Sequence, residues 1–140
     1  MAWSATSRFA GDRDSPGAAR TFAAETLASL YDDASAVRGT CEDLAIIVSE
    51  LVTNSVQADS PSIEVALEVD DGHLRVAVSD HVGGTPVLAG TAPADQPHGR
   101  GLAIVATLAQ RWGVLLGPDA GPGKTVWAQL LLSPTPDRMS

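Results

Sequence analysis

Two polar side chains four residues apart, Glu50 and Asn54, stand in the segment SELVTNSVQA. If this segment is a helix, four residues turn through about 400°, so both side chains lie on one stripe. A carboxylate and an amide at this spacing suit a hydrated Mg²⁺ ion, which takes few protein oxygens and keeps several waters. An ordinary solvated helix face carries the same kind of pair, so the spacing by itself leaves both interpretations open.

A second candidate is Asp80, which ends a predicted strand and is followed by paired glycines at Gly83 and Gly84. A carboxylate at the end of a strand can accept a hydrogen bond from an amino group held in a cleft. Glycines nearby let the backbone approach a ligand closely. Asp and Gly are also favoured in a simple turn that ends a strand, and this remains the alternative.

A third candidate is the run Gly99-Arg100-Gly101-Leu102, which opens a predicted helix. The first turn of a helix exposes backbone amides, and the helix dipole favours an anion there. The side chain of Arg100 adds a positive charge. The glycines therefore predict a phosphate site, with a flexible hinge as the alternative.

The segment GPGKT, residues 121–125, resembles the end of a phosphate-binding P-loop. That motif needs a glycine five residues before the glycine that precedes the lysine, and here Pro118 holds this position. The residues that follow, VWAQLLL, alternate like a strand, whereas the motif requires a helix. We therefore do not predict a P-loop.

The elements that position these residues follow from the periodicity. Residues 1–10 predict an edge strand, and Ser15-Pro16 predicts a helix N-cap followed by proline in the first turn. Thr40 and Asp43 resemble a capping box, which predicts a second helix that ends near Ala58 because Pro61 cannot continue it.

The pattern then changes to strand alternation over residues 62–69 and 74–79, with a hairpin turn at Asp71-Gly72. About 19 residues from His81 to Gly99 lack periodicity, as expected of a functional lid or of a disordered segment. A helix over 101–111 and strands over 112–116 and 124–132 complete the pattern. We predict an α+β fold: a two-layer α/β sandwich with a mostly antiparallel mixed sheet and helices on one face. It forms one domain over 1–133, with a short tail at 134–140.

Composition limits the function. The 140 residues carry a formal net charge of −8, which argues against direct binding to nucleic acid. Apolar runs fall short of the ~20 residues that a membrane span needs, and no signal peptide is visible, so we expect a cytoplasmic protein. One cysteine, Cys41, excludes an internal disulfide, and the histidines lack the spacing of metal ligands.

One family is resembled by the motifs taken together and in their order along the chain: ELVTN, the strand-end Asp80, GRGL and GKTVW. They resemble the GHKL ATP-binding domains, which have the Bergerat or histidine-kinase-like ATPase fold. Within it the chain is most similar to the small anti-sigma-factor serine/threonine protein kinases of bacteria. The resemblance runs from about residue 8 to residue 132, nearly the whole chain.

The resemblance implies that the chain binds ATP with Mg²⁺. By this resemblance, Glu50 activates the attacking hydroxyl or water, Asn54 ligates the Mg²⁺ that bridges the phosphates, and Asp80 accepts the adenine amino group. The remaining implied contacts are close approach near the base at Gly83 and Gly84, phosphate contacts from the GRGL motif at Gly99, Arg100, Gly101 and Leu102, and support of the adenine through water by Thr125.

The resemblance also implies a regulatory kinase that sequesters a sigma factor and phosphorylates a Ser or Thr of an antagonist protein. Family members often form homodimers. The alternative is a non-catalytic partner-binding module with weak or no nucleotide turnover. Gln57, Ala58 and the placement of Gly83-Gly84 depart from the family pattern and favour that alternative. A third hypothesis is a plain ATPase. It is less favoured, because the sequence shows no transducer domain that would use the energy of hydrolysis.

Overall fold

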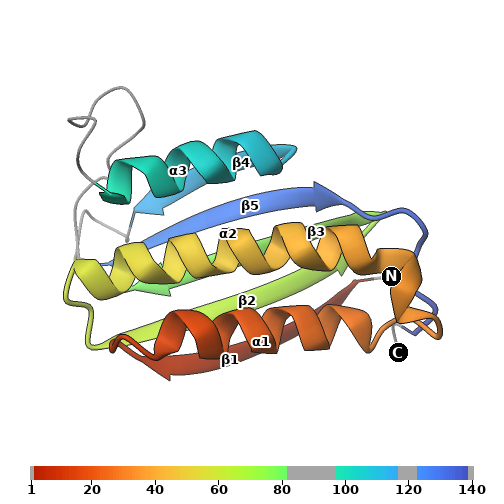
Figure 1. Cartoon of the computed structure of the whole chain (residues 1–140), viewed down its shortest axis with the longest axis horizontal. Helices are drawn as coiled ribbons and strands as arrows, with labels where there is room; N and C mark the ends of the chain where they lie inside the picture. The colour runs from red at the N-terminus through yellow and green to blue at the C-terminus, as the bar shows by residue number, and fades with distance from the viewer. Residues whose placement is uncertain (1, 82–96, 117–122, 139–140) are drawn as a thin grey trace.

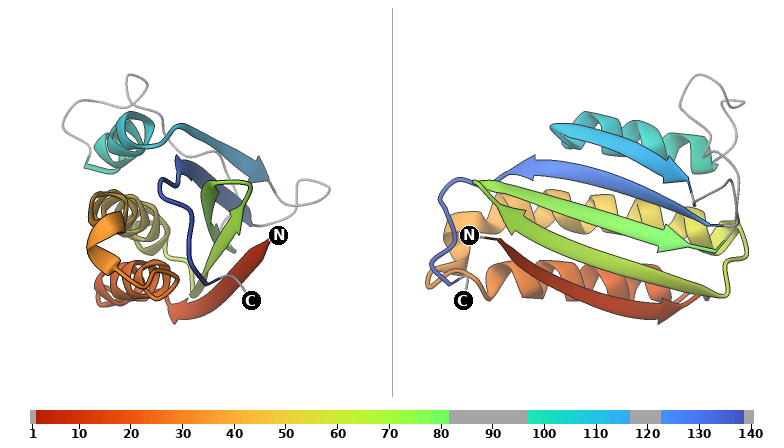
Figure 2. Two further views of the ribbon diagram at one scale, coloured as in Figure 1. Left: turned by 90° about the vertical axis from the view of Figure 1, so that its right-hand side faces the viewer. Right: turned by 180° about the vertical axis from the view of Figure 1, so that it is seen from behind.

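The structure is a computed structural model that describes residues 2–81, 97–116 and 123–138. Five strands form one sheet of order β1-β2-β3-β5-β4, and all four neighbouring pairs are antiparallel. Helices α1, α2 and α3 cover one face of it (Figures 1 and 2). The elements are β1 (Trp3–Ala10), α1 (Ser15–Ala28), the 3₁₀ helix η1 (Ala34–Val37), α2 (Arg38–Gln57), β2 (Ser62–Asp70), β3 (His73–Asp80), α3 (Pro97–Leu108), β4 (Arg111–Leu116) and β5 (Lys124–Leu131). The predicted two-layer α+β sandwich is confirmed.

The core lies between the helices and the inner face of the sheet. Helix α1 buries small residues at every fourth position, Ala19 and Ala23, before Leu27. This stripe lets the helix approach its neighbours closely. Every second residue of β2 is buried, as expected of a strand with one solvent-exposed face. The buried residues of α2 are Leu44, Ile47, Val48, Leu51, Val52 and Ser55.

The β2–β3 hairpin forms at the predicted turn. Asp71 has a φ of 52° and Gly72 a φ of 73°. Two successive residues with positive φ are typical of the tight turns that match the twist of paired strands. The resulting register pairs Ile63 with Asp80, so that Asp80 follows Val78 on the inner face of β3.

All three predicted helix starts differ from the structure. The N-cap of α1 is one residue earlier than predicted, and α2 and α3 begin two to four residues earlier. Helix α1 has Asp14 as its N-cap, and Ser15 is its first residue, whose hydroxyl donates to the Ala10 carbonyl. Helix α2 begins at Arg38 because η1 leads directly into it, and no side chain caps it, so the capping box at Thr40 is not formed. Helix α3 begins at Pro97, four residues before the predicted start.

The segment after β5 is bonded to the end of α1. The Tyr31 hydroxyl donates to the Pro134 carbonyl at 2.7 Å, and the backbone amides of Asp137 and Arg138 donate to the Leu30 carbonyl. Arg138 also pairs with Asp32 at 2.6 Å. These bonds hold the chain end against the helical layer, at the end of the molecule opposite to the site described below (Figure 1).

The topology brings the ends of two helices and two strands to the same end of the molecule. Helix α2 and strand β3 end, and helix α3 and strand β5 begin, at the left end of the molecule in Figure 1. The view from behind shows the same grouping (Figure 2). Residues 50–54, 80 and 97–101 therefore lie toward one end of the fold, although they are far apart in the sequence. No helix in the described ranges is long and apolar enough to cross a bilayer.

Candidate functional site

The Asp80 carboxylate is the centre of a buried polar cluster. Ser55 Oγ donates to Asp80 Oδ2 at 2.7 Å. Lys124 Nζ lies 3.0 Å from Oδ2 and 3.2 Å from Oδ1. The Asp80 side chain is 1% exposed and that of Lys124 is 9% exposed. Buried charges are tolerated when they are paired and hydrogen-bonded, and this cluster meets both conditions.

Each member of the cluster comes from a different element. Asp80 continues the buried alternation of β3, Ser55 lies on the apolar stripe of α2, and Lys124 is paired with Asp80 in the β3–β5 register. A serine among the apolar residues of a helix is a sequence signal for a buried partner, which the search for charged motifs overlooked. Lys124 was not among the predicted site residues, although it lies in the GKTVW segment that carries part of the family resemblance.

Thr125 does not lie beside Asp80. Its hydroxyl is 2.7 Å from the Ser79 hydroxyl, and both residues alternate away from the helices, on the open face of the sheet. Successive side chains of a strand point to opposite faces, so a shift of one residue changes the face. The position opposite Asp80 on the inner face is held by Lys124, and support of the adenine through water by Thr125 stays a prediction.

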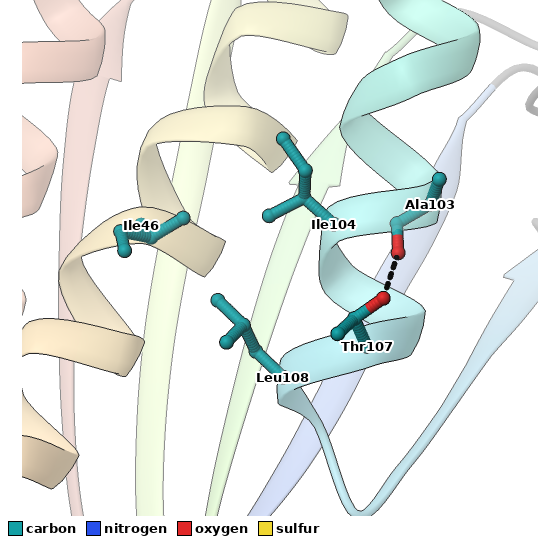
Figure 3. Close-up of a pocket in the computed structure, with 5 residues that line it drawn as sticks. All are labelled: Ile46, Ala103, Ile104, Thr107 and Leu108. Carbon is teal, nitrogen blue, oxygen red and sulfur yellow. Dashed lines mark hydrogen bonds between the residues drawn. The ribbon is translucent and has the colours of Figure 1, made fainter.

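Glu50 and Asn54 are half-buried on α2. With Ile46 they fall at every fourth residue, and such residues share a stripe along a helix. Ile46 lines a groove together with residues of α3 (Figure 3). Glu50 and Asn54 therefore lie on the flank of α2 that is turned toward α3. They lie one and two turns beyond Ile46 along α2, which brings them nearer to the start of α3.

The groove between α2 and α3 is a separate feature. It has a volume of about 450 Å³ and is lined by Ile46, Ala103, Ile104, Thr107 and Leu108 (Figure 3). The Thr107 hydroxyl, its one polar side chain, donates to the Ala103 carbonyl at 3.0 Å. The lining offers no charged group, so it is unsuited to a phosphate.

The start of α3 determines which residues of the GRGL motif have backbone amides outside the intrahelical hydrogen bonds. Because the helix begins at Pro97, Gly99 and Arg100 fall among the first four residues, whose amides have no acceptor within a helix. Gly101 is the fifth residue, where intrahelical bonding begins. Leu102 is 1% exposed and packs in the core, so its side chain serves the fold. Gly83 and Gly84 lie outside the described residues.

Close backbone contacts fix the strand ends around Asp80. Gly123 has a φ of 115°, and a Cβ built on it would lie 3.1 Å from the Asp80 carbonyl oxygen. Ser60 Oγ accepts from the His81 amide at 3.3 Å and donates to the Ser62 carbonyl at 2.7 Å. A Cβ on Gly11 would lie 1.6 Å from the Ser60 carbonyl oxygen, so this position accepts only glycine. The backbone around the end of β3 is thus closely packed.

The donor set fits Mg²⁺ better than a metal held by protein alone. Within residues 2–81, 97–116 and 123–138, no group of three or more His, Cys, Asp or Glu residues is placed to hold a metal ion. Mg²⁺ needs no such cage, because it is commonly bound by one or two protein oxygens, substrate phosphates and water. The amide oxygen of Asn54 has the chemistry of such a ligand, and Asn54 lies on α2 toward the end of the fold where Asp80 lies.

Comparisons with known proteins agree with this arrangement. The crystal structure of the RsbU and RsbW domains of a Mycobacterium tuberculosis protein matches with a TM-score of 0.67 and 22% sequence identity, over 96% of this chain and 33% of that chain. At this identity the match shows the shared fold, and this chain spans a third of the length of that one. No protein of curated function matches the sequence.

The family comparison covers most of the chain. The sequence profile of the family described as the histidine kinase-like ATPase domain matches residues 10–130. This range includes every element from α1 to β4 and nearly all of β5. The chain belongs to the histidine kinase-like ATPase domain family, and the resemblance to GHKL domains is confirmed.

Proposed function

We propose that the protein binds Mg²⁺–ATP at the end of the sheet where α2, β3, α3 and β5 meet, and that it acts as a regulatory kinase of the anti-sigma-factor type. The observation that carries the proposal is the convergence of three kinds of group. A buried carboxylate at Asp80, a carboxylate–amide pair at Glu50 and Asn54, and the first turn of α3 all lie toward that end.

Each group has a role that its chemistry permits. Asp80, whose oxygens lie near the ends of β3 and β5, accepts a hydrogen bond from the exocyclic amino group of adenine. The first-turn amides of α3 donate to phosphate oxygens, which the helix dipole also favours. Asn54 contributes an amide oxygen to the cation, and bound Mg²⁺ neutralises charge on the phosphates.

We propose that Glu50 serves the transfer step. It stands one helical turn before Asn54 on the same flank of α2, so that its carboxylate can accept the proton of a hydroxyl brought to the phosphates. Phosphoryl transfer depends mainly on positioning and on stabilisation of charge, which these groups supply. We propose a Ser or Thr of an antagonist protein as the acceptor and a sigma factor as the sequestered partner.

One observation favours a second candidate, a binding module without turnover. Gln57, one turn beyond Asn54, is the last residue of α2 and is exposed and uncharged, and Ala58 is the C-cap of this helix. The family resemblance implies a cationic side chain at position 57 and a histidine at position 58. This chain has neither of these two polar side chains at those positions. In this candidate the nucleotide stabilises the fold and the protein acts by sequestering its partner.

Two measurements test the proposal. Isothermal titration of the full chain with ATP in Mg²⁺, repeated with the cation chelated, should show binding that depends on Mg²⁺. Incubation with radiolabelled ATP and candidate antagonist proteins should then label a Ser or Thr, and Glu50→Gln should bind ATP but fail to label. Binding without labelling favours the module, and absence of binding in Mg²⁺ contradicts the proposed function.

A further inference from the structure

We propose that Lys124 is a positioning residue for recognition of the base: its ammonium group pairs with the Asp80 carboxylate and orients it, so that Asp80 can accept from the amino group of a 6-aminopurine. This inference rests on the proposed function, because it concerns the same site. Lys124 is the single lysine among the 140 residues.

The first argument is burial. Asp80 has a side chain that is 1% exposed, in the inner layer of the sheet beside Val78 and Ile63. An isolated carboxylate in such surroundings loses its charge or turns toward water. Ser55 donates one hydrogen bond but carries no charge. Lys124 supplies the opposite charge within 3.2 Å of both carboxylate oxygens, which offsets the cost of burying the Asp80 side chain.

The second argument is orientation. Lys124 Nζ reaches both oxygens of Asp80, at 3.0 and 3.2 Å, while Ser55 Oγ reaches Oδ2 alone. Two contacts from β5 and one from α2 restrict rotation of the carboxylate plane.

The third argument is that the backbone is shaped for this pair. Asp80 and Lys124 are partners in the β3–β5 register. Gly123, directly before Lys124, has a φ of 115° and passes close to the Asp80 carbonyl. The Lys124 side chain is thereby directed to the inner face, whereas Thr125 bonds to Ser79 on the other face.

A comparison of two ligands separates this role from a purely structural one. The probes are ATP and purine riboside triphosphate, which lacks the 6-amino group. Wild type should bind ATP about tenfold or more tightly than the analogue, as expected of a hydrogen bond to a charged group. In Lys124→Met the affinity for ATP should fall until the two ligands bind within about threefold of each other, while binding of the analogue changes little.

Two variants serve as controls. Lys124→Arg keeps the charge and should restore part of the preference for ATP. Arg111→Met removes an exposed cation from the neighbouring strand β4 and should leave the preference unchanged. Equal loss of both ligands in Lys124→Met, or tighter binding of ATP, would overturn the inference.

A second measurement needs no ligand and no substitution at Lys124. Selective ¹⁵N labelling of lysine side chains gives one ammonium signal, because the chain has one lysine. Its resonance should shift in Asp80→Asn and not in Asp59→Asn, which changes an exposed carboxylate. An unmoved signal in Asp80→Asn would overturn the ion pair and the inference with it. Failure of wild type to bind ATP would instead overturn the proposed function, together with the role given to the pair.

Discussion

Ser55 and Asp80 are joined by a hydrogen bond of 2.7 Å that links helix α2 to the end of strand β3. The bond lies one residue after Asn54, so the proposed metal ligand and the proposed base acceptor are held by one connection between the two layers. Motion of α2 relative to the sheet would disturb both ends of a bound nucleotide. The hydrogen bond therefore serves the geometry of the site as well as the stability of the fold.

Substitution Ser55→Ala should lower the free energy of unfolding by about 1.5–3 kcal/mol, because it removes a buried hydrogen bond to a charged group. Urea denaturation followed by circular dichroism measures the change. Ser29→Ala is the matched control, since its exposed hydroxyl donates only to the Thr26 carbonyl in its own helix. That control should stay within about 0.5 kcal/mol of wild type. Equal stability of Ser55→Ala and wild type would mean that the bond contributes nothing.

Substitution Asn54→Ala should weaken ATP binding in Mg²⁺ by about tenfold or more, because loss of groups that hold a metal typically costs 10–100-fold. Binding with the cation chelated should be the same as for wild type. Gln57→Ala, an exposed position on the same helix, is the control and should bind as wild type does. Calorimetric titration that shows full Mg²⁺-dependent affinity in Asn54→Ala would remove this residue from the site.

Substitution Gly113→Ala should destabilise the fold by about 1–3 kcal/mol through overpacking. A Cβ there would lie 2.9 Å from the ring of Trp127, which also has the Arg75 guanidinium 4.6 Å from its centroid. A shift in tryptophan fluorescence should accompany the loss. Gly39→Ala is the opposite case, because a Cβ there meets nothing within 4 Å in α2 and should stabilise by roughly 0.4–1 kcal/mol. Unchanged stability and fluorescence in Gly113→Ala would show that the ring moves aside freely.

Stability should fall at alkaline pH. Burial raises the pKa of Tyr31 above its ordinary value of 10.0, and the nearby Cys41 and Asp137 raise it further. Burial, with a smaller contribution from Glu42, also raises the pKa of the Cys41 thiol above 9.0. A raised pKa in the folded state gives stability that is complete below the unfolded value and is lost as the pH rises through the folded one.

Urea unfolding at pH 7 and pH 10.5 measures this loss. Tyr31→Phe removes the hydroxyl that donates to Pro134 and should cost about 0.5–1.5 kcal/mol at pH 7. It should also lose less stability than wild type between the two pH values. An equal alkaline loss in the variant would assign the effect to other groups.

Periodicity was sufficient to predict the order of elements and the hairpin turn, because both depend on local alternation and on turn residues such as Asp71 and Gly72. The helix starts were less accessible, since η1 and the contact of Ser15 with Ala10 depend on tertiary packing. The pairing of Lys124 with Asp80 was not predicted. Whether Lys124 or Thr125 meets Asp80 depends on a register of one residue, which is set by the pairing of β3 with β5.

The most direct measurement is a crystal structure of the full chain grown with Mg²⁺ and a non-hydrolysable ATP analogue. We predict the adenine amino group within hydrogen-bonding distance of Asp80, the cation on the Asn54 amide oxygen, and the phosphates at the first turn of α3. A nucleotide bound elsewhere, for example in the apolar groove beside Ile46, or a base that leaves the Asp80 carboxylate untouched, would contradict the proposal.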